Sequence, residues 1–385
     1  MSKTKNKETI ANLENAIKDI KDKKSELFFL VVDSKNIPNS NMQYIYEMAR
    51  TCKDNGYSVT MLYQLTDEYT KGELYNLKKK NLEIDQNRIF GGVNEWLGER
   101  YSSLKHINIS TEEFDVGPKD YLFIPESLSS FMFETYRLKV PCKRIVILQN
   151  FNYVTDFVPL GVEWKNYGIY DAIASTEKQK ILIQNVFPYV NVDVLPPFIN
   201  EMFREKNEPK KLIVNVIAKD QKTINRIIKP FYWKYPMYKF ITFRDLRNFP
   251  RERYAEMLQE SAFTVWVDDD VLFGYSPLEA IRCNSIVIGK IPENVPEWME
   301  DEEGIINNGF WCYNINDMPD LIAKVIGSWM QEYIPDELVQ SMKETNGKYT
   351  KEAYEKNLMN LIDGLNDKLV NELVEIKASL LNKSE

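Results

Sequence analysis

The sequence predicts an α/β protein made of two Rossmann-like domains, each a doubly wound parallel sheet. Apolar runs alternate with amphipathic helical segments through residues 26–205, and the alternation starts again after the charged stretch "FINEMFREKNEPKK" at 198–211. Strands that alternate with helices form parallel sheets covered on both faces. A chain of 385 residues that is 44% hydrophobic can also bury two separate cores.

The first domain, expected at 26–205, begins with the fully apolar strand "LFFLVVD" at 27–33. A helix at 42–57 follows and should stop at Gly56. Further strands are expected at 58–63, 106–110, 120–126, 143–150, 171–176 and 192–197, with helices at 128–139 and 177–187. The aromatic stretch 149–171 is expected to be a long loop, and long loops often carry function.

The second domain, expected at 206–345, repeats the pattern. Its strands are expected at 212–218, 239–243, 263–270 and 285–290, with helices at 251–261 and 318–330. A further helix is expected between the first two of these strands, and another between the last two.

Amphipathic helices are expected at both ends of the chain, at 1–25 and at 346–385. Each carries an apolar stripe at helical spacing, and the second is interrupted by Gly364. We expect these helices to pack on the body or on each other, and a homodimer seam is the alternative.

Composition sets bounds on the function. A formal charge of −8 argues against a protein whose whole surface binds nucleic acid, although a local basic groove would not show in that sum. The four cysteines lie far apart, no apolar run is long enough to span a bilayer, and the first residues, "MSKTKNKE", are polar. We therefore expect a cytoplasmic protein with reduced thiols and no transmembrane segment.

Several common active sites are unsupported. The chain has one histidine, His106, in a strand-like segment, so a His-ligated metal or a Ser-His-Asp triad would rest on that single residue. No glycine-rich dinucleotide or Walker loop follows any predicted strand. We expect no metal and no cofactor of these kinds.

The stretch "DDDVLFGYSPLEAIRCNSIVIGK" at 268–290 is the most informative in the chain. Ser276, Pro277 and Glu279 predict a helix start, with Ser276 as N-cap, Pro277 at the first position and Glu279 completing a capping box. The N-terminus of such a helix can also bind an anion such as a diphosphate. Gly274 would let the backbone approach a ligand closely.

The order Phe273, Gly274, Pro277, Leu278, Glu279, followed by Ala280 and the strand "SIVIG", resembles the donor signature of GT-B glycosyltransferases. The resemblance is strongest to the retaining family 4, or group 1, whose signature is Glu-x7-Glu. It covers residues 210–330 by motif and the first domain by topology alone. Asn284 stands where the family has Gly, and Asn also accepts the left-handed conformation that ends a helix.

The resemblance implies a donor site for a nucleoside diphosphate sugar. It assigns Glu279 to the ribose hydroxyls and Gly274, Ser276, Pro277 and Leu278 to the surrounding pocket. One position departs from the pattern, because Val271 occupies the place of the first Glu of the motif. Asp269 or Asp270 would then replace that Glu, the sugar would be held differently, or donor binding has been lost.

The family also has a basic pair after the first strand of its second domain. The corresponding residues here are Lys219 and Lys222, whose charge would offset the charge that builds on the leaving diphosphate. Arg244, after the next strand, is a candidate for the nucleobase side. Exposed lysines at a helix start, and an Asp run after a buried strand, are also common features without function.

The first domain should hold the acceptor. Asp33 and Glu126 follow strands, and either acid would act as general base if transfer inverts, or anchor an acceptor hydroxyl if it retains. Further acceptor-side candidates are Asn39 and Asn41 in the loop "SKNIPNSN" and the aromatic residues Tyr153 and Trp164. The two aromatic residues could equally pack in a core.

We therefore predict a metal-independent GT-B glycosyltransferase that moves a sugar from a nucleoside diphosphate sugar, a UDP-sugar by preference, to a hydroxyl acceptor. The acceptor is either a glycan or, as in some virus-encoded transferases, a modified nucleobase in DNA. Two alternatives remain open: a non-catalytic GT-B-like binding or assembly module, and a nucleotide-sugar epimerase.

Overall fold

The computed structural model describes residues 3–31, 40–63, 101–109, 112–247, 249–269 and 273–382. The chain divides into two compact units, unit 1 with residues 1–196 and 355–385, and unit 2 with residues 197–354. The division comes before the expected boundary at 205/206, and the C-terminal helix belongs to unit 1 rather than to a separate segment. Among the described helices, none is long and apolar enough to cross a bilayer.

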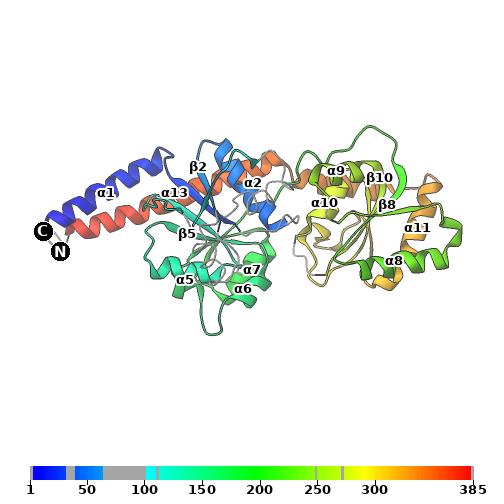
Figure 1. Cartoon of the computed structure of the whole chain (residues 1–385), viewed down its shortest axis with the longest axis horizontal. Coiled ribbons are helices and arrows are strands. Elements are labelled where there is room, and N and C mark those ends of the chain that lie inside the picture. The colour runs from blue at the N-terminus through cyan, green and yellow to red at the C-terminus, as the bar shows by residue number, and fades with distance from the viewer. Residues whose placement is uncertain are drawn as a thin grey trace, which may run out of the picture. The chain divides into compact units, whose positions relative to one another are not determined.

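Unit 1 is built on a seven-stranded sheet whose strand pairs are all parallel, with the order β3-β2-β1-β4-β5-β6-β7. Its strands are β1 (Glu26–Val31), β2 (Ser58–Tyr63), β3 (Lys105–Asn108), β4 (Tyr121–Pro125), β5 (Lys143–Leu148), β6 (Asp171–Ala174) and β7 (Asn191–Val194). The main helices are α2 (Ser40–Asp54), α5 (Ser129–Arg137), α6 (Phe151–Phe157) and α7 (Glu177–Val186) (Figure 1). The expected strands and helices of the first domain are thus confirmed.

One expectation in unit 1 is wrong. Residues 149–171 are not one long loop, because they contain α6 and the short 3-10 helix η2 (Trp164–Tyr167). The side chain of Asn150 starts α6 by accepting a hydrogen bond from the N–H of Asn152 at 3.0 Å. An Asn N-cap was therefore the available signal in the sequence.

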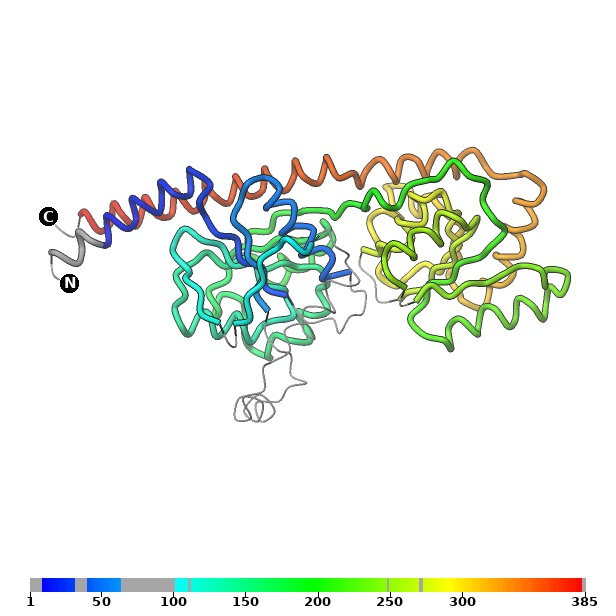
Figure 2. Tube along the Cα trace, turned by 45° about the horizontal axis from the view of Figure 1, so that its top comes forward, coloured from blue at the N-terminus to red at the C-terminus, as the bar shows by residue number. Residues whose placement is uncertain are grey.

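The two ends of the chain pair with each other. Helix α1 (Lys3–Lys21) lies beside α13 (Lys351–Asn382) in both views (Figures 1 and 2). An ion pair of 2.7 Å joins Lys377 Nζ to Glu14 Oε1. Buried residues line the two stripes, Leu13, Ala16 and Ile20 on α1 and Leu358, Ile362, Leu365, Leu369 and Leu373 on α13. Helix α13 runs through Gly364 without a break, and a Cβ added to this glycine would meet nothing within 4 Å.

Unit 2 contains a five-stranded sheet, also parallel, with the order β14-β11-β10-β8-β9. Its strands are β8 (Lys211–Ala218), β9 (Thr242–Asp245), β10 (Ser261–Val267), β11 (Ile286–Lys290) and β14 (Phe310–Cys312). Its helices include α8 (Gln221–Lys234), α9 (Arg251–Glu260), α10 (Tyr275–Arg282), α11 (Met318–Met330) and α12 (Asp336–Lys348). A two-stranded hairpin of β12 (Glu300–Asp301) and β13 (Gly304–Ile305) follows β11.

Strand β10 is the centre of unit 2. All seven of its residues are buried, and it pairs with β8 on one side and with β11 on the other. The carboxyl ends of β8, β10 and β11 therefore lie at one edge of the sheet. In doubly wound sheets the ligand binds at this edge.

Candidate functional site

The candidate site of unit 2 lies at the carboxyl edge of its sheet, where α8 and α10 begin. After β8, the side chain of Asp220 caps α8 by accepting a hydrogen bond from the N–H of Thr223 at 2.7 Å. The predicted cations Lys219 and Lys222 flank this cap. Lys222 is exposed, so its ammonium can reach a ligand at the start of α8.

Helix α10 begins differently from the expectation. Its N-cap is Gly274 in the left-handed conformation (φ 74°, ψ 79°), and no side chain caps the helix. The predicted capping box of Ser276 and Glu279 is therefore wrong, because the helix already starts at Tyr275 and places Pro277 in its first turn. Without a side-chain cap, the dipole at the first N–H groups is available to an anion.

The other end of α10 follows the expectation. Asn284 has a φ of 56°. The N–H of Asn284 bonds to the carbonyl of Ile281, and the N–H of Ser285 bonds to the carbonyl of Ala280, both at 2.9 Å. This is a Schellman motif with Asn in the usual glycine position.

The loop that leads into α10 is held by aromatic residues. Phe273 is buried and lies 5.1 Å from the ring of Tyr275 and 5.4 Å from that of Tyr349. Its carbonyl accepts a hydrogen bond from the indole of Trp298. These contacts fix Gly274 and therefore the position of the helix N-terminus.

Glu279 is a buried and paired acid. Only 1% of the residue is exposed, and the guanidinium of Arg251 binds both carboxylate oxygens, at 2.5 and 3.4 Å. Arg251 itself packs over the rings of Phe203 at 4.7 Å and Tyr254 at 5.5 Å. The predicted ribose ligand is thus engaged by an arginine that sequence reasoning missed, because the two residues lie 28 positions apart.

Two further basic residues stand at the same edge. Lys290, the last residue of β11, forms an ion pair with Asp269. Arg247, just after β9, binds Asp245 with nitrogen to oxygen distances of 2.5 to 3.0 Å and also donates to Gln221 at 2.7 Å. The Arg247 guanidinium holds the pKa of Asp245 below its usual range. Neither residue was among the sequence candidates.

The placement of Arg244 argues against its predicted role. It lies within β9, and its guanidinium pairs at 3.0 Å with Glu260, the last residue of α9. Glu260 directly precedes the first residue of β10 and also binds Lys211 at the start of β8. Arg244 therefore points to the amino-terminal edge of the sheet, away from the ends of the strands.

In unit 1 the candidate acid Glu126 follows β4 and is buried, with 1% exposed. Its Oε1 accepts hydrogen bonds from the N–H groups of Asn150 at 2.7 Å and Gln149 at 3.1 Å. Burial raises the pKa of Glu126 from 4.5 to about 7, although these backbone donors oppose the rise. The Gln149 side chain in turn donates to the carbonyl of Asn41 at 3.1 Å, so the structure links Asn41 to Glu126.

The remaining first-domain candidates are scattered. Tyr153 lies on α6 with its ring 6.0 Å from that of Phe157. Trp164 is a core residue with 0% exposed, 5.4 Å from the ring of Phe187, so neither face of its indole is open to a ligand. This burial argues against an acceptor-side role for Trp164. The first-domain candidates Asp33 and Asn39 lie outside the described residues, as do Asp270 and Val271 of the second domain.

His106 has the structural role that its strand suggested. Its Nδ1 lies 2.8 Å from the carbonyl of Leu104 and its Nε2 lies 3.0 Å from the hydroxyl of Tyr46. Burial lowers the pKa of the imidazole. Within the described parts of the chain, no group of three or more His, Cys, Asp or Glu side chains is arranged to hold a metal ion.

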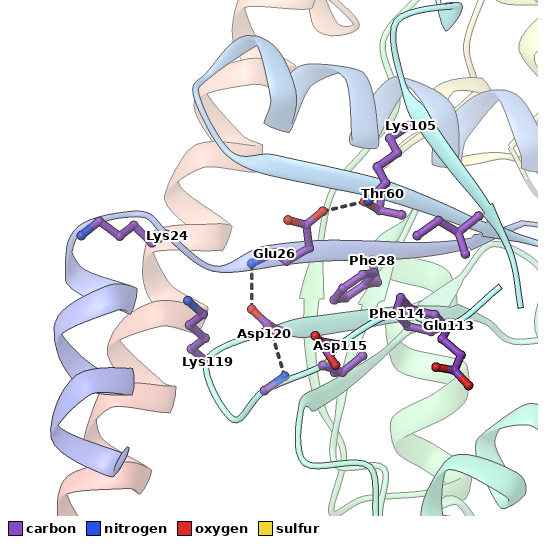
Figure 3. A pocket seen from close by; sticks show the side chains of 13 residues that line it. Lys24, Glu26, Phe28, Thr60, Lys105, Glu113, Phe114, Asp115, Lys119 and Asp120 are labelled. Atoms are coloured by element: carbon purple, nitrogen blue, oxygen red, sulfur yellow. Dashed lines mark hydrogen bonds between the residues drawn. The ribbon is translucent and has the colours of Figure 1, made fainter. Parts of the chain in front are cut away.

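A separate pocket of about 520 Å³ lies beside β1, β2 and β3 in unit 1 (Figure 3). The side chain of Glu26 accepts a hydrogen bond from the hydroxyl of Thr60 at 2.6 Å. The backbone N–H of Glu26 donates to the carboxylate of Asp120 at 2.8 Å. Because Glu26 is the first residue of β1, this pocket lies at the amino-terminal edge of the sheet, opposite Glu126. Lys105 and Asp115 also line it, so its charges are mixed.

Comparison with known proteins identifies the fold. No family model matches the chain, and no curated protein sequence matches it. Solved structures do match over most of their length: HepE from Anabaena in complex with UDP and glucose has a TM-score of 0.58 at 9% identity, covering 88% of this chain and 100% of that chain. The chain has the GT-B fold.

Other GT-B structures agree. The pneumococcal O-GlcNAc transferase GtfA in complex with UDP and GlcNAc has a TM-score of 0.57 at 9% identity, covering 91% of this chain and 99% of that one. Sucrose-phosphate synthase from Thermosynechococcus elongatus has a TM-score of 0.54 at 12% identity, covering 89% and 99%. At such low identity the likeness establishes the GT-B architecture, and the chemistry has to be argued from the residues.

Proposed function

We propose that this protein is a glycosyltransferase that transfers a sugar from a nucleoside diphosphate sugar, with UDP as the nucleotide, to a hydroxyl acceptor. The observation that carries the proposal is the start of α10. Gly274 leaves the helix without a side-chain cap, and β11 ends at Lys290 next to β10. An uncapped helix N-terminus beside a lysine is a suitable site for a diphosphate.

The cations of unit 2 would supply the charge that transfer needs. Negative charge develops on the diphosphate as the glycosidic bond breaks, and fixed positive groups stabilise it. Lys290 ends β11, and Lys219 and Lys222 follow β8, at the edge where α10 starts. We propose that they take the place of a divalent ion. Structural neighbours in complex with UDP, GtfA and HepE among them, support the choice of nucleotide.

Lys290 would change partners when donor binds. In the structure it pairs with Asp269, whose side chain is half exposed, at 52%. A diphosphate carries more negative charge than one carboxylate and would draw the ammonium away from Asp269. Asp269 would then be free to bind the donor sugar. It would take the role of the first Glu of the family motif, whose place Val271 occupies here.

For the acceptor we propose Glu126 of unit 1. A carboxyl group with a pKa of about 7 is suited to accept a proton from a hydroxyl near neutral pH. It would act as general base if transfer inverts, or anchor a hydroxyl if transfer follows the retaining course of family 4. A glycan acceptor is the default, and a modified nucleobase in DNA is the alternative.

A binding module without transfer is the second candidate. It is favoured by the pairing of Glu279 with Arg251 and by the nearly complete burial of that carboxylate. Both candidates predict UDP binding at α10, and only the first predicts turnover.

The test compares Lys290→Ala with Lys211→Ala, since Lys211 forms an ion pair at the opposite edge of the same sheet. Losing one charge-assisted hydrogen bond should weaken UDP binding about tenfold in Lys290→Ala and leave it unchanged in Lys211→Ala. Isothermal titration calorimetry measures the affinities, and release of free sugar or UDP from a UDP-sugar panel measures turnover. UDP binding without turnover favours the binding module, while equal affinities in both variants contradict the proposed site.

A further inference from the structure

The segment 226–240, "RIIKPFYWKYPMYKF", differs in charge from the rest of the chain. It contains four cationic and six aromatic residues and no Asp or Glu, in a protein whose net charge is −8. It forms the later part of α8, the short 3-10 helix η3 (Pro236–Tyr238) and the residues that lead into β9. We call it the α8–β9 corner.

The inner aromatic residues fix this corner in place. Phe231 is fully buried, and the ring of Tyr238 stacks on it at 5.9 Å. The hydroxyl of Tyr232 donates to the carbonyl of Ile241 at 2.6 Å. The hydroxyl of Tyr235 donates to Asp320 on α11 at 2.8 Å. The corner is therefore a preformed surface, held from its inner side.

The outer apolar residues face solvent. Trp233 is 76% exposed, Met237 64% and Phe240 59%. They lie within a stretch of eight residues that includes two successive turns. One turn is closed by a hydrogen bond from the N–H of Tyr238 to the carbonyl of Tyr235, and the other by one from the N–H of Ile241 to the carbonyl of Tyr238. Exposed apolar groups gathered at one place mark an interaction site more often than isolated ones do.

The surrounding charges are positive. Arg226, Lys229 and Trp233 follow one another at spacings of three and four, so they share one face of α8. Lys239 is exposed beside Phe240. Asp320 pairs with Lys234 at 2.8 Å, and Asp317 lies near enough for its charge to act on the same ammonium. Arg226, Lys229 and Lys239 have no acidic partner among the described residues of unit 2.

We propose that the α8–β9 corner docks the protein on an anionic lipid surface. Trp and Phe rings partition into the headgroup region of a bilayer, and flanking lysines bind anionic headgroups. A second copy of the chain does not fit, because a symmetric contact would bring the same cations together. Single-stranded nucleic acid is the competing occupant, because Trp233 and Phe240 could stack bases. The bilayer fits better, since the third exposed apolar residue, Met237, has no aromatic face to stack a base and can enter lipid.

Docking here leaves the candidate donor site open. The corner leads into the first residue of β9, at the amino-terminal edge of the sheet, whereas Gly274 and Lys290 stand at the carboxyl edge. A bilayer on the corner would therefore not cover the start of α10. The inference does not rest on the proposed transferase activity.

Vesicle flotation of the full-length protein tests the proposal. Phosphatidylcholine vesicles with a minority of phosphatidylglycerol should carry the protein upward, and vesicles of phosphatidylcholine alone should carry much less. Trp233→Ser combined with Phe240→Ser should weaken binding to the anionic vesicles by roughly tenfold or more, because the interfacial anchors are lost. Lys229→Gln combined with Lys239→Gln should weaken it by about 25-fold, at about fivefold for each cation near the surface.

The matched control is Leu160→Ser, which removes a fully exposed apolar side chain from unit 1 and should leave flotation unchanged. Melting temperature and UDP affinity, measured on each variant, separate lost docking from misfolding. Three results would overturn the proposal: no flotation of the folded wild type, equal flotation of all variants, or a corner that dimerises the protein or binds single-stranded DNA in place of vesicles.

Discussion

Replacing Glu126 by Gln should change how the stability of unit 1 depends on pH. Gln keeps the shape and an oxygen that can accept from the N–H groups of Gln149 and Asn150, but it cannot ionise. In the native protein, burial raises the pKa of Glu126 from 4.5 to about 7. The substitution therefore isolates the free energy of burying this negative charge.

The sign follows from proton binding. An acid with a raised pKa binds its proton more tightly in the folded state, so the folded protein is favoured at low pH and loses stability as the pH rises from 4.5 to about 7. At about 1.4 kcal/mol per pKa unit, the loss amounts to about 3 kcal/mol. Glu126→Gln should match the wild type at pH 5 to within about 1 kcal/mol and exceed it by about 3 kcal/mol at pH 8.

Urea titration followed by hydrogen exchange of the peptides that contain β4 and β5 reports the unfolding of unit 1 alone. Glu177→Gln is the matched control, because Glu177 is an exposed acid on α7 in the same unit, and its effect should be nearly the same at both pH values. A difference between Glu126→Gln and wild type that does not change with pH would refute the argument that Glu126 is buried and costly to ionise.

Two further substitutions test unit 2, and a third tests helix α13 of unit 1. Arg251→Met should destabilise unit 2 by about 3 to 5 kcal/mol, measured by urea unfolding of β10 peptides, since it leaves Glu279 buried and unpaired. Adding Glu279→Gln should restore most of the loss, and no restoration would contradict the pairing. Gly274→Val should lower the free energy of unfolding of unit 2 by about 1 to 2 kcal/mol in the same titration, because a β-branched residue is strained at a φ of 74°. The same substitution should abolish UDP binding in calorimetry. Gly364→Ala should stabilise α13 by about 0.5 to 1 kcal/mol in thermal unfolding, since a Cβ meets nothing there, and a loss of stability would mean that the helix needs a break at this position.

The sequence predicted the layers of the fold because they depend on local patterns. Fully apolar runs such as residues 27–31 are typical of central strands in a covered sheet, and the alternation with helices favours parallel pairing of those strands. Asn284 could be placed because the left-handed end of a helix depends on a single residue. The terminal helices were predicted from apolar residues at helical spacing. That α1 and α13 pack against each other was visible only in the structure.

The candidate site was predicted less completely, since its contacts are long-range. The pairs of Arg251 with Glu279 and of Lys290 with Asp269 join residues 28 and 21 positions apart, and no local pattern encodes them. The capping box at Ser276 failed for a different reason. The motif matched, but Gly274 in the left-handed conformation starts the helix earlier and leaves the Ser hydroxyl without a capping role. The same spacing in a sequence thus allows two different helix starts.

The most direct test of the central claim is a crystal structure with UDP bound. We predict that the diphosphate lies at the N-terminus of α10, within hydrogen-bonding distance of the N–H groups of Tyr275 and Ser276, with Lys290 moved from Asp269 to a phosphate oxygen. A structure in which UDP binds elsewhere, with Lys290 still paired to Asp269, would contradict the account.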